Sequence, residues 1–127
     1  MDIRIYRISL ESSGYGAQDV TAYIAELVYK NNLRKGLAVV YTNEKGCSVV
    51  EIEYEPELLA DLEEFLKKIG CMDGGFCSIL LGKSVVVPIV NNSLFLGQFK
   101  KIVFIDVSRI SGEKSLVIVL EGLFKDS

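Results

Sequence analysis

The C-terminal third of the chain, residues 82–122, constrains the fold more than any other stretch. It contains apolar runs at 84–90, 94–107 and 115–121, separated by turn-forming Asn, Ser and Gly residues. β-branched and aromatic residues fit a pleated, half-buried surface, and Asn and Gly tolerate the positive φ of tight turns. The pattern predicts three successive strands, which form a sheet against which the earlier elements pack.

Two earlier segments have helical periodicity. Residues 20–31 carry a one-sided apolar stripe, and Asp19 precedes them as a predicted N-terminal cap. Residues 56–69 begin with Pro56, whose missing N–H needs no partner in a first turn, and Gly70 follows as a typical C-terminal cap. The second helix is predicted to bury a stripe made of Leu58, Leu59, Leu62, Phe65, Leu66 and Ile69.

Further strands are predicted at 2–10, 37–41, 47–54 and 76–81. The segments 37–41 and 47–54 are separated by a connection of hairpin length. In 2–10 the apolar phase changes near Tyr6, which predicts either a β-bulge or burial of both faces. Residues 11–17 are rich in Ser and Gly and are predicted to form a loop.

Together these elements predict one α+β domain over residues 1–127. Consecutive strands with short turns favour antiparallel pairing, so we expect a sandwich-like antiparallel β-sheet with two packed helices. A chain of 127 residues buries roughly two-thirds of its unfolded surface, enough for one core. Half of the residues are hydrophobic, which excludes a disordered chain.

The charge balance excludes several functions. There are 14 basic and 17 acidic side chains, which argues against a nucleic-acid binder that neutralises phosphates. No run approaches the ~20 apolar residues of a membrane span. The first residues are charged from Asp2 onward and show no signal peptide, so we expect a cytoplasmic protein.

The complete absence of histidine is the most informative feature of the composition. It removes Ser–His and Cys–His nucleophile activation and most transition-metal sites, so we predict no tightly bound zinc or other transition metal, with Mg²⁺ left as a possible cofactor. The three cysteines, Cys47, Cys71 and Cys77, lack the tight spacing of zinc ligands. We expect them to be reduced and to pack as small hydrophobic side chains, with a redox or metal role as the alternative.

Three acidic residues are candidates for catalysis. Glu51 and Glu53 alternate along a predicted strand, and Asp61 lies in the following helix. Paired carboxylates can exchange protons or hold a hard cation such as Mg²⁺. The plain alternative is a solvated strand face and a helix residue near the favourable end of the helix dipole.

Hydroxyl and cationic groups form a second candidate set, for binding a phosphorylated ligand. It consists of Ser84, Lys100, Arg109 and Lys114, together with the turn Gly14-Tyr15-Gly16 ahead of a predicted helix N-terminus. Each member has an ordinary alternative, such as strand-end polarity or a glycine turn that serves the helix cap.

The order and spacing of the C-terminal residues resemble the YjbQ family, often labelled secondary thiamine-phosphate synthase. The family pattern is Gly-x-Ser-x-x-x-Pro, a short turn, and Leu-Gly-Thr-Trp-Gln. Its counterparts here are Gly82, Ser84, Pro88, Leu96, Gly97 and Phe99. The resemblance implies a YjbQ-like fold, a homotrimer and a link to thiamine-phosphate synthesis.

The chain departs from the family at its histidines. The three family histidines fall at Asn43 (or near Tyr41), Ala60 and Gly75, and the glutamine after the family tryptophan falls at Lys100. The resemblance therefore implies that the fold is retained and the chemistry lost.

Two hypotheses follow. The first is a non-catalytic homo-oligomer that retains a site for a small phosphorylated ligand. Its mean hydropathy of +0.32 agrees with apolar surface buried between subunits. The alternative is a thiamine-phosphate synthase-like transferase that uses the carboxylates and a Mg²⁺ ion.

Overall fold

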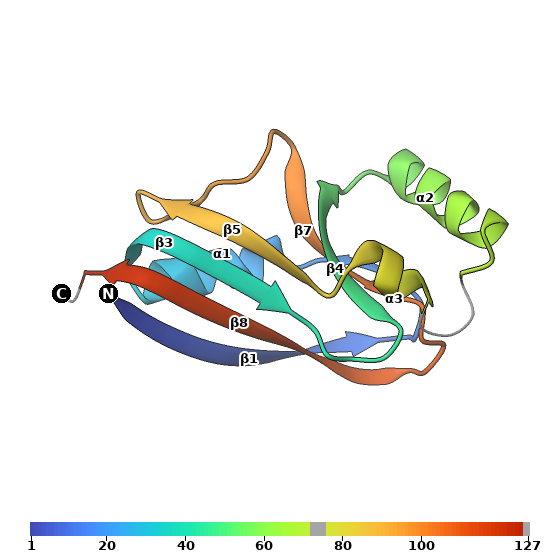
Figure 1. Cartoon of the computed structure of the whole chain (residues 1–127), viewed down its shortest axis with the longest axis horizontal. Coiled ribbons are helices and arrows are strands. Elements are labelled where there is room, and N and C mark those ends of the chain that lie inside the picture. Colours follow the sequence, from blue (N-terminus) through green and yellow to red (C-terminus); the bar gives the residue numbers. More distant parts are fainter. Residues whose placement is uncertain (72–75, 126–127) are drawn as a thin grey trace.

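The computed structural model describes residues 1–71 and 76–125, and these residues form two antiparallel sheets and three helices (Figure 1). In chain order the elements are β1 (Asp2–Ser12), β2 (Gly16–Asp19), α1 (Thr21–Lys30), β3 (Leu33–Tyr41), β4 (Cys47–Glu53), α2 (Pro56–Lys68), α3 (Phe76–Leu81), β5 (Ser84–Val90), β6 (Ser93–Leu94), β7 (Lys100–Asp106) and β8 (Gly112–Phe124).

The larger sheet has five strands in the order β1-β8-β3-β5-β6, and the smaller has three in the order β2-β7-β4. All the pairings are antiparallel, so the predicted α+β class with a sandwich-like antiparallel sheet is confirmed. β8 is the longest strand of the larger sheet and pairs with β1 and β3. Its Val119 lies opposite Ile5 of β1 on one side and Val39 of β3 on the other.

The main core lies between the larger sheet and a layer made of the smaller sheet and α1. Ala38, Val40 and Ile118 face inward from the larger sheet, and Phe104 and Ile24 meet them from the opposite layer, all fully buried. Burying one such large apolar side chain contributes about 1.5–3 kcal/mol, so this cluster is the main stabilising contact between the layers.

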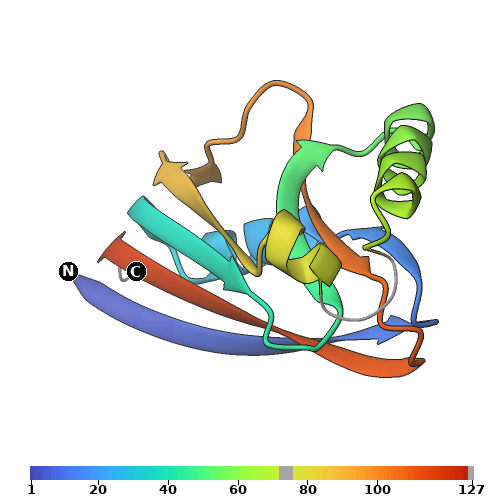
Figure 2. The same ribbon diagram turned by 45° about the vertical axis from the view of Figure 1, so that its right-hand side comes forward.

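The other face of the smaller sheet is also covered. Val103, Ile105 and Val107 pack there against Leu66 of α2 and against Cys71 and Cys77. Figure 2 shows α2 on the far side of β4 and β7 from the larger sheet. β7 is therefore buried on both faces, which explains its continuous apolar sequence.

Glycine is required where β3 and β8 come closest. Gly36 and Gly122 lie opposite each other in this ladder, with φ values of +154° and +149°. A Cβ atom on Gly36 would lie 1.9 Å from the carbonyl oxygen of Glu121, so no side chain fits without moving the strands.

Several predicted elements differ from the structure. Segments 37–41 and 47–54 do not form a hairpin, because β3 belongs to the larger sheet and β4 to the smaller. Phe76–Leu81 is helix α3 rather than a strand, since a six-residue apolar run has no period that separates the two. The predicted loop 11–17 overlaps the end of β1 and the start of β2, and β2 pairs with β7.

The burial predicted for β1 and α2 is also corrected. β1 pairs with β8 without a bulge, and Ile3 and Ile5 point outward and are exposed. In α2, which is described over its whole length, Leu66 is buried, but Phe65 is 58% exposed. Asp19 ends β2, and its carboxylate accepts a hydrogen bond from the Thr21 amide at 3.0 Å.

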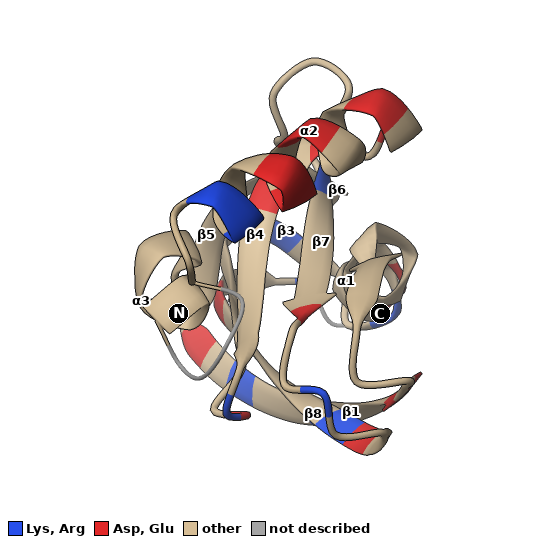
Figure 3. Ribbon diagram, turned by 90° about the vertical axis from the view of Figure 1, so that its right-hand side faces the viewer, with Lys and Arg blue, Asp and Glu red and all other residues tan. Residues whose placement is uncertain are grey.

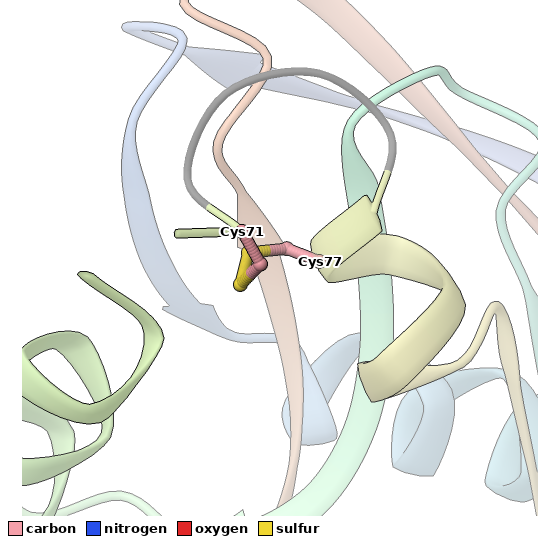
Figure 4. Close-up of a disulfide and its surroundings, with 2 residues drawn as sticks. All are labelled: Cys71 and Cys77. Atoms are coloured by element: carbon pink, nitrogen blue, oxygen red, sulfur yellow. A yellow bond between two sulfur atoms is a disulfide. The ribbon is translucent and has the colours of Figure 1, made fainter. Parts of the chain in front are cut away.

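A disulfide joins Cys71, just after α2, to Cys77 in the first turn of α3 (Figure 4). Both cysteines are fully buried against the smaller sheet. The expectation that all three cysteines are reduced is therefore wrong for this pair, because the fold brings their Cα atoms to 4.9 Å. Cys47 is free and buried.

Candidate functional site

The structure separates the predicted site residues into groups at the two ends of β7. At its first end, Glu53 lies opposite Lys100 in the β4–β7 ladder, and Glu51 lies opposite Ile102. β7 has 7 residues, so its other end, at Asp106, lies roughly 20 Å away. Lys114 contacts that second end, so Lys100 and Lys114 cannot bind one phosphate together.

Asp106 is the centre of a buried polar network at the second end. Its carboxylate accepts hydrogen bonds from the Ser12 hydroxyl at 2.6 Å and the Ser108 amide at 2.8 Å. The Lys114 Nζ lies 3.9 Å from the same carboxylate and donates to the Ser108 hydroxyl at 3.2 Å. Lys114 is thus engaged inside the protein, and it is almost completely buried.

Hydrogen bonding determines the charge state of this carboxylate. Burial alone would raise the pKa of Asp106, but hydrogen bonds from Ser12 and Ser108 outweigh burial and lower it. Asp106 therefore stays ionised at neutral pH and is suited to pairing with Lys114 rather than to accepting a proton.

Cys47 completes this network. It lies opposite Asp106 in the β4–β7 ladder, and its thiol is hydrogen-bonded to that carboxylate. Burial and the nearby negative charge raise the pKa of Cys47 to about 12. Because the thiolate is the reactive form, Cys47 is an inert buried thiol at physiological pH.

A second set of contacts joins the surrounding loops. Thr42 donates its hydroxyl proton to the Ser115 carbonyl at 3.1 Å, and the Ser115 amide donates to Glu44 Oε2 at 2.7 Å. Lys83 donates to the carbonyl oxygens of Glu44 and Cys47 at 2.5 and 2.7 Å. Sequence reasoning missed these loop-joining roles, although the Thr-x-Glu spacing is typical of a local side-chain turn.

Ser84 lies next to this region, at the start of β5, where it pairs with Tyr41 and is exposed. The turn Gly14-Tyr15-Gly16 leads into strand β2 rather than into a helix, so it does not lie at a helix N-terminus as expected. The turn does meet Arg109. The Arg109 amide donates to the Gly14 carbonyl at 2.8 Å, and its guanidinium lies 4.3 Å from the centroid of the Tyr15 ring.

A cavity of about 310 Å³ lies between α2 and the smaller sheet. Leu59, Leu62 and Leu66 of α2 form one wall, and Ile105 and Val107 form the other. The remaining lining residues are Tyr15, Gly16, Ala17, Pro56, Ala60 and Glu63. Sequence reasoning missed this cavity because it assigned the whole α2 stripe to the core.

The polar residues at the cavity mouth come from two elements. The Tyr15 hydroxyl is hydrogen-bonded to Glu63, and Glu63 forms an ion pair with Lys67 at 2.9 Å. The hydrogen bonds from Lys67 and Tyr15 lower the pKa of Glu63, and burial raises the pKa of Tyr15. Figure 3 shows acidic turns along α2 followed by basic residues at its C-terminal end.

The remaining predicted positions are dispersed. Asp61 is exposed on α2 and is not part of the cavity lining. Of the positions that correspond to family histidines, Asn43 is exposed, Ala60 lines the cavity, and Gly75 lies outside the described residues. Within residues 1–71 and 76–125, no three Cys, Asp or Glu side chains converge to hold a metal ion.

None of the helices in the described part of the chain has the length and apolar character needed to cross a membrane.

The fold defines a class of protein: an α+β sandwich of two antiparallel sheets, with polar loops joined at one end. The chain belongs to the UPF0047 protein YjbQ-like family, whose model matches residues 6–122. It is 30% identical over 103 residues to a UPF0047 protein of Archaeoglobus fulgidus, covering 71% of this chain and 79% of that one.

Solved structures show the same fold. A YbjQ-like protein of unknown function from Sulfolobus solfataricus has a TM-score of 0.78 at 18% identity, covering 96% of this chain and 100% of that chain. An uncharacterised conserved protein of the YjbQ/UPF0047 family from Clostridium acetobutylicum has a TM-score of 0.82 at 19% identity, covering 91% and 99%.

Proposed function

We propose that this chain is a non-catalytic YjbQ-like protein that acts as a homo-oligomer. The proposal rests on the finding that the buried polar side chains are hydrogen-bonded within the protein. Every buried side-chain nitrogen and oxygen in the described residues has a hydrogen-bond partner. Lys114 and Asp106 pair with each other, so neither is poised to meet a substrate.

The outer face of the larger sheet supports self-association. Ile5, Val119, Val39 and Val86 lie in one row across β1, β8, β3 and β5. Ile5 is 66% exposed and Val86 is 55% exposed. Val39 and Val119, between them, are partly exposed. An apolar row of this kind on an outer face is typical of a protein interface, and a second copy of the chain is its simplest occupant. The family resemblance favours a trimer.

The transferase alternative receives little support. Thiamine-phosphate formation needs a leaving pyrophosphate to be neutralised and a proton to be moved nearby. Glu51 and Glu53 lie near Lys100, while Arg109 and Lys114 belong to the opposite end of β7. A Mg²⁺ ion would have to bind Glu51, Glu53 or Asp61, and those residues do not form a three-ligand cluster in the described chain.

A small phosphorylated ligand would depend mainly on Arg109. Of the two predicted ligand-binding cations at that end, Lys114 is engaged with Asp106, whereas Arg109 is exposed. Titration with inorganic phosphate, for wild type and Arg109→Ala, tests this part of the proposal. Equal affinity of the two proteins would contradict it.

The decisive test of the non-catalytic proposal is turnover of thiamine-phosphate synthase substrates with and without Mg²⁺. We expect no turnover above background, because a missing positioned acid–base group typically costs about 10²–10⁴ in rate. Clear turnover that disappears in Asp61→Asn would show that the transferase hypothesis is right instead.

We also propose a cytoplasmic location, although a disulfide is uncommon in that compartment. Alkylation of thiols at the moment of lysis, followed by mass measurement, reports how much of Cys71–Cys77 is oxidised in the cell.

A further inference from the structure

We propose that the cavity beneath α2 binds a small aliphatic molecule that carries a single anionic head. Its volume of about 310 Å³ falls within the usual range of small-molecule sites. The proposal does not depend on whether the protein is catalytic or oligomeric.

The cavity exists because α2 packs tightly only near its C-terminal end. Leu66 is buried there, and the disulfide at Cys71 lies just beyond. Nearer the start of the helix, Leu59 and Leu62 point into the cavity and are only partly covered. Apolar side chains facing a void lose contact energy, which an aliphatic occupant would restore.

The side chains that form the cavity walls indicate the chemical nature of the buried part of the ligand. Three leucines of α2 face Ile105 of β7 and Val107, which directly follows β7, and Pro56, Ala17 and Ala60 complete an aliphatic surface. The polar side chains of this lining, Tyr15 and Glu63, are hydrogen-bonded to each other, and the other lining side chains are apolar. A hydrocarbon body therefore fits better than a nucleoside or a carbohydrate.

The charged side chains near the cavity mouth indicate the charge of the ligand's head group. Lys67 and Arg109 do not line the cavity, but they lie beside its lining residues Glu63 and Tyr15, so this group of side chains carries two positive charges and one negative charge. The lowered pKa of Glu63 keeps its carboxylate ionised. The raised pKa of Tyr15 keeps its hydroxyl protonated, and this hydroxyl donates a hydrogen bond to Glu63. One positive charge remains in excess. It would attract a carboxylate, sulfate or phosphate head and repel a cationic one.

Binding of decanoate to the whole chain tests the proposal, measured by calorimetry below the concentration at which micelles form. We expect saturable 1:1 binding of decanoate and at least tenfold weaker binding of decyltrimethylammonium, which has the same tail and the opposite charge. No decanoate binding at millimolar concentration, or equal affinity for the two amphiphiles, would overturn the proposal.

Two matched pairs of variants locate the site. Ala60→Leu places a larger side chain at the exposed edge of the cavity lining and should weaken decanoate binding at least tenfold, whereas Ala22→Leu makes the same change on an exposed position of α1 outside the lining and should not. Lys67→Gln should weaken binding about threefold, as expected for a screened surface charge, and Lys68→Gln should not.

These variants also distinguish decanoate binding in the cavity from decanoate binding on the apolar outer face of the larger sheet. If Ala60→Leu binds decanoate as tightly as wild type, the amphiphile binds elsewhere and the assignment is wrong. Circular dichroism of Ala60→Leu verifies that α2 still forms. Light scattering on the same samples reports the oligomer independently, so failure of one proposal leaves the other open to its own test.

Discussion

Lys114 and Asp106 form an ion pair inside the protein, with side chains that are 9% and 2% exposed and charged atoms 3.9 Å apart. The pair joins β8 to the end of β7, and so connects the larger sheet to the smaller one. Lys114 was a candidate ligand-binding residue on sequence grounds. Its pairing with Asp106 gives the cation at this position a structural role.

Removing one member of the pair should strongly destabilise the protein. Lys114→Met leaves Asp106 ionised and buried without its counter-charge, and such losses cost about 3–5 kcal/mol. Urea unfolding measures the loss, with Lys45→Met as a control because Lys45 is exposed. Equal stability of the two variants would contradict a structural role for the pair.

Cys47 should make the protein less stable at alkaline pH. Its pKa is raised from 9.0 to about 12 in the folded state, so the unfolded chain loses this proton first as pH rises. The thiol's contribution to stability is complete below pH 9 and is lost between pH 9 and about 12. Denaturant unfolding from pH 8 to 11 should show a steeper decline for wild type than for Cys47→Ala. Parallel declines would mean that the thiol titrates normally.

Reduction of Cys71–Cys77 should lower stability by about 2 kcal/mol, the chain-entropy value for a loop this short. Comparing unfolding with and without a phosphine reductant measures the effect. The double variant Cys71→Ala/Cys77→Ala is the control and should not respond to the reductant. A wild-type protein whose stability is unchanged by reductant would show that the disulfide does not form in solution.

Local sequence patterns predicted individual elements well where residues typical of turns or helix ends mark the boundaries. β5 spans the predicted residues 84–90, and α2 begins at Pro56 as expected from proline's preference for a first helical turn. Strand partners were not predictable in this way. β3 and β4 are close in sequence but belong to different sheets, because their partners β8 and β7 come much later in the chain.

The candidate site was predicted less well for a related physical reason. A sequence shows that Lys114 carries a charge but not that Asp106 lies beside it. It also shows an apolar stripe on α2 but not that the helix stands away from the sheet over Leu59 and Leu62. Residue types suggested the chemistry, and only the packing revealed which groups are already engaged.

The outer face of the larger sheet gives the final prediction, on assembly. If copies of the chain meet there, a charge on this face must be desolvated in the interface and should separate the subunits. Ile5→Glu and Val86→Glu place a carboxylate on exposed positions of β1 and β5. Light scattering should give an oligomer for wild type and a 14.1 kDa particle for either variant. Tyr23→Glu, at an exposed apolar position on α1, is the control and should remain oligomeric. A wild-type particle of 14.1 kDa at micromolar concentration would refute self-association altogether.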